Sequence, residues 1–272
     1  MNRILCLITL LALAGSSVRA DVAAAGRNVL AAHQDAVVTV KLVLNQSMSF
    51  GGRDQQNEST TETIGTVIDP SGLTVISLST IDPAATLRSL LAKQMRGQAG
   101  DIKIDSQVKD AKLVLADGTE LTAQVVLRDK DLDLAYLRPV DKPAKPLAAI
   151  SLAGAATPQV LDEVICLNRL GKVANRVVAV SIERIDAVVD RPRTFYIIGQ
   201  GGSSGIGSPV FAASGAPVGV ILMRNVTTEG EGNITSMFSG ASALGIMPII
   251  VPAADILEDA KQALETPKPA TR

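Results

Sequence analysis

Two short strands and a tight turn are encoded by the stretch Thr63-Ile64-Gly65-Thr66-Val67-Ile68-Asp69-Pro70-Ser71-Gly72-Leu73-Thr74-Val75-Ile76-Ser77-Leu78. Residues 63–68 and 73–78 are rich in Val, Ile and Thr, which favour β-strands. Between them, Pro70 presets its own backbone angle and Gly72 can adopt a positive φ, so residues 69–72 predict a turn. The stretch therefore predicts a β-hairpin.

The same pattern of short strands and turns recurs on both sides of this hairpin. Residues 141–146 carry two prolines and two lysines and predict a connection between two halves. Many short strands at regular spacing are typical of a barrel or a sandwich. Six strands on each side predict an all-β fold of two packed six-stranded antiparallel β-barrels, about 36–140 and about 147–251. The further strands expected are 36–44, 111–115, 121–127, 134–137, 163–168, 175–185, 194–198, 208–212, 218–223 and 245–250.

Three segments interrupt or flank the strands. Apolar residues recur at helical spacing within 83–100, which predicts a short inserted helix followed by a loop. Residues 252–264 predict a C-terminal helix before a polar tail at 265–272, and residues 22–35 predict a short leading helix. Residues 45–61 are polar and contain Gly51-Gly52, so we expect an exposed loop there.

The N-terminus carries the features of an export signal. Met1-Asn2-Arg3 is a basic start, residues 4–14 are apolar, and Val18-Arg19-Ala20 suits cleavage after Ala20. This predicts a signal peptide at 1–20, a mature domain at 21–272, and a periplasmic or secreted location. The apolar run is too short to cross a bilayer, and we expect no membrane span after cleavage.

Composition argues against several classes of function. The formal net charge is −1, from 26 basic and 27 acidic residues, and there is no tryptophan, so nothing favours nucleic-acid binding. Cys166 is the one cysteine that remains after cleavage, so no internal disulfide is expected. His33 is the single histidine, and no pattern of metal ligands is present. We expect neither a metal nor a cofactor.

Three stretches, in order, resemble trypsin-like serine proteases of the HtrA/DegP type. Residues 65–81 are similar to the family's G-x-x-I-D-x-x-G-x-I-V-T-N-x-H-V-V. Residues 115–120 and 131–137 are similar to L-x-D-G-x-x followed by D-L-A-V-L. Residues 205–211, with 215–220 after them, are similar to N-S-G-G-P-L-V followed by G-x-V-x-G-I. The resemblance covers roughly residues 30–265 and implies a chymotrypsin-type fold. The chain ends soon after its last expected helix, so no C-terminal PDZ domain is expected.

The resemblance assigns the catalytic triad to Ser79, Asp133 and Ile206. The reaction needs a histidine as base, an aspartate that orients it, and a serine nucleophile. Only the aspartate is retained, because the histidine position holds Ser79 and the serine position holds Ile206. The loop Gly205-Ile206-Gly207-Ser208 corresponds to the family's oxyanion and peptide-binding loop. His33 precedes the first strand and is expected far from this site.

These positions leave three functional hypotheses. The first is an exported pseudoprotease that acts as a binding or regulatory module for an extended peptide or a protein partner. The second is a serine endopeptidase or hydrolase with a relocated nucleophile, at Ser203, Ser204 or Ser208, of which Ser208 is the fallback choice. The third is a structural partner subunit of an active homologue. The oligomeric state is not indicated by the sequence.

Overall fold

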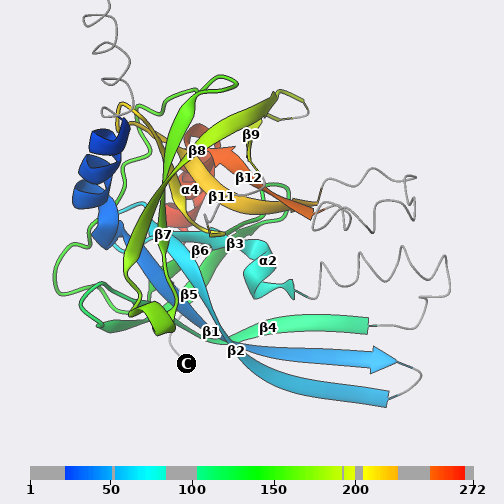
Figure 1. The fold of residues 1–272 in the computed structure, drawn as a ribbon. Helices are drawn as coiled ribbons and strands as arrows, with labels where there is room; N and C mark the ends of the chain where they lie inside the picture. Colours follow the sequence, from blue (N-terminus) through cyan, green and yellow to red (C-terminus); the bar gives the residue numbers. More distant parts are fainter. Residues whose placement is uncertain are drawn as a thin grey trace, which may run out of the picture.

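The computed structural model describes residues 22–50, 53–83, 103–191, 193–199, 205–225 and 246–266. They form two closed barrels of six strands each, with strand orders β1-β2-β3-β6-β5-β4 and β10-β11-β12-β9-β8-β7 (Figure 1). All of the strand pairs are antiparallel, which confirms the predicted fold. The first barrel is built from β1 (Val37–Phe50), β2 (Arg53–Val67), β3 (Thr74–Ser77), β4 (Lys103–Val114), β5 (Glu120–Asp129) and β6 (Leu134–Pro139). The second is built from β7 (Glu163–Arg169), β8 (Val178–Val189), β9 (Phe195–Ile198), β10 (Pro209–Ala212), β11 (Pro217–Asn225) and β12 (Ile246–Pro252).

The hairpin predicted at residues 63–78 is present, with one change at its end. The Ser71 amide donates to the Asp69 side chain at 2.8 Å, and Gly72 has a φ of 91°. These features close the turn between β2 and β3. The second strand ends at Ser77, one residue before the expected limit. Leu78 instead begins α2 (Leu78–Ile81), a single helical turn.

Helices flank the barrels at both ends of the described chain. Residues 22–33 are helical and lead through η1 (Gln34–Ala36) into β1, and α4 (Ala253–Glu265) follows β12. Both were expected. A further short helical turn, η2 (Lys172–Ala174), lies between β7 and β8. The inserted helix expected within 83–100 falls almost wholly outside the described residues. Within those residues, no helix has the length and apolar character needed to cross a bilayer.

The expected loop at residues 45–61 was wrong. β1 and β2 remain paired in unbroken register from Val37↔Thr66 out to Phe50↔Arg53, and β4 pairs with β1 from Thr39 to Ser49. In Figure 1 these three strands form an arm that extends beyond the barrels. Residues 55–58 are exposed on both faces of the arm. Such a strand shows no alternation of apolar and polar residues, so its sequence pattern resembles that of a loop.

One hydrophobic cluster runs through the first barrel and into the second. It includes Leu42, Ile76 and Leu137 from the first barrel, and Leu167 and Phe211 from the second. The helix α4 adds Ile256 and Ala260 to the same cluster. The fully buried Tyr136 hydroxyl on β6 donates to the Ile256 carbonyl at 3.1 Å. The two barrels and α4 therefore share one core, and a smaller cluster fills the interior of the second barrel.

A buried arginine satisfies backbone carbonyls where the barrels meet. Arg169, at the end of β7, is 9% exposed. Its Nε donates to the carbonyl of Val37, Nη1 to that of Arg176 at 2.9 Å, and Nη2 to that of Gln34 at 3.1 Å. The carbonyls of Gln34 and Val37 belong to η1 and to the start of β1, so Arg169 ties the end of β7 to the beginning of the first barrel. Burial lowers the pKa of Arg169, as expected for a cation removed from water.

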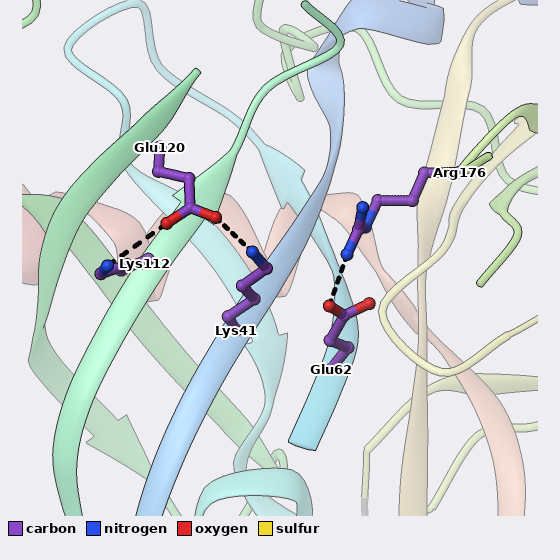
Figure 2. A network of polar contacts seen from close by, with 5 residues as sticks. All are labelled: Lys41, Glu62, Lys112, Glu120 and Arg176. Carbon is purple, nitrogen blue, oxygen red and sulfur yellow. Dashed lines mark hydrogen bonds and ion pairs between the residues drawn. The ribbon is translucent and has the colours of Figure 1, made fainter. Parts of the chain in front are cut away.

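Ion pairs on the outside of the first barrel reinforce the same region (Figure 2). Arg176, beyond η2, reaches across to Glu62 on β2 at 2.6 Å. Glu120 on β5 receives both Lys41 and Lys112, the latter at 3.2 Å. All five side chains are partly exposed, so each pair is worth at most about 1 kcal/mol. The Arg176–Glu62 pair joins the segment between β7 and β8 to β2, and so links the two barrels.

We expect Arg169→Ala to lower the free energy of unfolding by about 3 kcal/mol, because three carbonyls lose their donor in a buried place. Chemical denaturation followed by circular dichroism measures this loss. Arg184→Ala is the matched control, because Arg184 lies on the adjacent strand β8 in an exposed pair with Glu163 at 3.7 Å. Its effect should stay within about 0.5 kcal/mol. Equal losses in the two variants would contradict the role assigned to Arg169.

Candidate functional site

Asp133, the expected aspartate position of the triad, lies at a tightly constrained point just before β6. Asp133 has a φ of 57°, in the left-handed region that aspartate tolerates better than most residues. The preceding turn is set by the Asp129 side chain, which accepts the amides of Asp131 at 2.7 Å and Leu132 at 2.9 Å. The Asp133 carbonyl accepts the Leu78 amide at 2.8 Å. These contacts direct the Asp133 carboxylate toward the start of α2.

The carboxylate of Asp133 receives donors from three different elements. Oδ1 accepts the backbone amide of Ser79 at 2.8 Å. Oδ2 accepts the hydroxyl of Ser77 and the backbone amide of Met223 at 3.1 Å. The Ser79 hydroxyl lies 3.4 Å from Oδ2 and 2.6 Å from the Ser77 hydroxyl. The structure thus brings Ser79 and Asp133 together and adds Ser77 and Met223 to them.

Burial dominates the acid–base behaviour of this group. Desolvation raises the pKa of Asp133 to about 6, although the hydrogen bonds from Ser77, Ser79 and Met223 act in the opposite direction. Because this pKa lies above the ordinary value of 3.8, folding favours the protonated form. The stability contributed by protonation is complete below that ordinary value and is lost as the pH rises through about 6.

The loop Gly205–Ser208 is held by hydrogen bonds to the first barrel and to β11. The Thr66 hydroxyl donates to the Gly207 carbonyl at 2.7 Å, and the Gly207 amide donates to the Ile221 carbonyl at 2.7 Å. Gly207 has a φ of 94°, and a Cβ added there would lie 2.0 Å from the Ile64 carbonyl oxygen. Only glycine fits this close backbone approach. The loop is therefore a fixed part of the seam between the barrels.

Ile206 is partly buried and Ser208 is fully buried. Ile206 is partly buried against the apolar cluster of the second barrel, and it lines an open hollow of about 280 Å³ with Ile64 and Arg169. Ser208 is fully buried, and its hydroxyl has no hydrogen-bond partner within the described part of the chain. Among the described residues, no hydrogen bond joins the Ser208 side chain to Ser79 or Asp133. Ser203 and Ser204 lie outside the described residues.

His33 is engaged elsewhere. Its ring stacks on Phe211 of β10, with centroids 4.9 Å apart and planes 15° from parallel. Burial lowers the pKa of His33, which favours the neutral ring. Among the described residues, its side chain makes no contact with Asp133.

Two members of this site were missed by the sequence reasoning. Ser77 ends β3 and immediately precedes the helical turn that carries Ser79, so its approach to Asp133 depends on a strand-to-helix change that the sequence did not predict. Met223 contributes only its backbone amide, which no side-chain pattern reveals. The assembled group is a partly buried carboxylate surrounded by hydroxyl and amide donors. It can accept hydrogen bonds and bind a proton, and it contains no histidine.

Comparisons with known proteins agree with this architecture. A family model described as "Trypsin-like peptidase domain" matches residues 65–220, more than half of the chain. A solved structure of the HtrA-type protease AlgW, with a serine-to-alanine substitution and a tripeptide, is similar with a TM-score of 0.53 and 15% identity. The similarity covers 88% of this chain and 64% of that one, so this chain spans less than two thirds of its length. At this identity the likeness shows the fold alone. The search of curated proteins returned no match.

Gly207→Ala should destabilise the protein by about 3 kcal/mol or more, because a methyl group would collide with the Ile64 carbonyl and the positive φ would add strain. Thermal unfolding measures the change. Gly215→Ala is the matched control, since Gly215 also has a positive φ of 85° but has nothing within 4 Å of an added Cβ. It should cost only about 1 kcal/mol. If both variants unfold alike, the close approach at Gly207 is not a constraint.

Proposed function

Since this chain belongs to the trypsin-like peptidase family, we propose that it is an exported pseudoprotease that binds extended peptide or protein segments without cleaving them. The observation that carries the proposal is the environment of Asp133. In a working triad this carboxylate orients a histidine that acts as the base. Here its oxygens are occupied by Ser77, the Ser79 amide and the Met223 amide.

The chemistry of the neighbouring side chains supports the loss of catalysis. A serine hydroxyl cannot serve as a base near neutral pH, and the sequence has one histidine, which stacks on Phe211. Ile206 has no nucleophilic atom. The buried Ser208 hydroxyl argues against the hypothesis of a relocated nucleophile at that position. Loss of a triad member lowers catalysis by roughly 10⁴–10⁶-fold.

A strand edge beside this site supports the binding role. β10 pairs with β11 only from Pro217 to Val220, whereas β12 pairs with β11 as far as Asn225. Residues 223–225 of β11, on the side away from β12, therefore have no partner among the described strands. We refer to this segment as the open edge. An extended peptide can add to such an edge through main-chain hydrogen bonds, with pockets for alternate side chains.

The signal sequence supports the exported part of the proposal. Residues 1–20 combine a basic start, an apolar core and a small residue at the cleavage position. A periplasmic or secreted location would expose the open edge to unfolded or partly folded proteins. If the open edge bound an active homologue, the protein would regulate that homologue as a partner subunit.

We expect the purified protein to bind fluorescently labelled, reduced and carboxymethylated α-lactalbumin, a permanently unfolded probe, without cleaving it. Binding is measured by anisotropy, and cleavage by gel electrophoresis. Asn225→Pro should weaken binding about tenfold, which corresponds to about 1.4 kcal/mol, because it removes a backbone amide of the open edge. Asn225→Ala keeps that amide and should bind like the wild type.

A serine-reactive fluorophosphonate provides the test for catalysis. We expect no labelling of the wild-type protein. Labelling that disappears in Ser203→Ala, Ser204→Ala or Ser208→Ala would overturn the pseudoprotease assignment in favour of a relocated nucleophile. Equal binding by the two Asn225 variants would place the peptide site elsewhere.

A further inference from the structure

The hydrogen bond between Asp133 and Met223 crosses from one barrel to the other. Asp133 immediately precedes β6 in the first barrel, and Met223 lies on β11 in the second. β11 lies against β3, the strand that supplies Ser77. The contact therefore joins the retained carboxylate to the very strand that carries the open edge.

The position of Met223 on β11 explains why this contact matters. Amides on successive residues of a strand point to opposite sides. The Ile221 amide points toward β10 and donates to the Ser208 carbonyl at 2.9 Å. Two residues later, the Met223 amide points to the same side, where β10 no longer pairs, and Asp133 accepts it at 3.1 Å. The carboxylate thus takes the place of a strand partner at the point where the open edge begins.

We propose that Asp133 is a positioning residue that holds the open edge of β11 through the Met223 amide, and that protonation of its carboxylate releases this edge and weakens peptide binding. The inference rests on the peptide-binding function proposed above. It gives the retained aspartate a task that needs neither a histidine nor a nucleophile.

The two serines provide a pathway for the change in protonation. With Asp133 ionised, Ser79 can donate to Ser77, and Ser77 donates to Oδ2. When Oδ2 gains a proton, that oxygen can donate to the Ser77 hydroxyl, and the donor chain through Ser79 reverses. The Met223 amide then faces a neutral oxygen, which accepts a weaker hydrogen bond than a carboxylate does. Because burial raises the pKa of Asp133 to about 6, this change falls within a mildly acidic range.

The charged groups on the surrounding elements do not contact this carboxylate. On β11, Arg224 lies over the Phe195 ring, with its guanidinium carbon 5.0 Å from the centroid. On β6, Arg138 donates to the Ala263 and Thr266 carbonyls near the end of α4. Asp129 and Asp131 belong to the preceding turn, and Asp82 caps the end of α2. Within the described residues, the pKa of Asp133 is therefore set by burial and by hydrogen bonds from the neutral groups of Ser77, Ser79 and Met223.

The test measures affinity for the labelled, carboxymethylated α-lactalbumin from pH 4.5 to 8, with near-ultraviolet circular dichroism confirming the fold at each pH. Wild-type affinity should fall about three- to tenfold as the pH drops through about 6. Ser77→Ala removes a donor to the carboxylate and should move the midpoint to higher pH. Asp133→Asn tolerates the same backbone conformation and should show weak binding with a flat profile. Asp131→Asn, at an exposed carboxyl two residues away, should keep the wild-type profile.

A second readout separates this inference from the function on which it rests. The amide resonance of Met223 in the ligand-free protein should titrate with a midpoint near 6 and should stop titrating in Asp133→Asn. If the probe binds with the same pH profile in the wild type and Asp133→Asn, the positioning role is overturned. If the probe does not bind at any pH, the peptide-binding function fails. In that case the Met223 amide resonance still tests whether protonation of Asp133 weakens the hydrogen bond. A resonance that does not titrate would exclude this weakening.

Discussion

Arg169 and Asp133 lie where the two barrels meet, and the hydrogen bonds that they form there position the elements around them. Each barrel closes on itself, so most of the strand length in its wall is paired on both sides and the end of β11 is an exception. The seam between the barrels is different, because strand ends and loops meet there without a ladder. Arg169 supplies donors to three carbonyls on one part of this seam. Asp133 accepts hydroxyl and amide groups on another. The buried Arg169 thus supplies donors and the partly buried Asp133 supplies acceptors at two separate points of the seam.

The elements that the sequence predicted well are those with strong local signals. The turns at Asp69–Gly72 and at Asp117-Gly118 combine an aspartate that binds a nearby amide with a glycine at positive φ. The helix α4 has regularly spaced apolar residues that join the shared core. The arm formed by β1, β2 and β4 was not predicted. Its outer residues face water on both sides, and its order comes from pairing between strands rather than from any pattern within one strand.

Some parts of the candidate site could be predicted from the sequence and others could not. The pairing of Ser79 with Asp133 could be predicted, because a resemblance in two stretches placed both residues. The contribution of Met223 could not, since it depends on which backbone amide the fold brings to the carboxylate. For Ile206, the sequence predicted the chemical character of the position but not the surroundings of the side chain. Its identity excludes a nucleophile, but its packing beside the inter-barrel hollow follows from the backbone contact between Gly207 and Ile64.

The burial of Tyr136 beneath α4 gives the protein a built-in optical reporter. The sequence contains no tryptophan and two tyrosines. Tyr136 belongs to the cluster shared by both barrels and α4, whereas Tyr196 belongs to the cluster inside the second barrel. Both are buried. Tyrosine absorption and emission of the native chain therefore come from two interior positions, and replacing one tyrosine with phenylalanine would leave a tyrosine probe that follows a single core during unfolding.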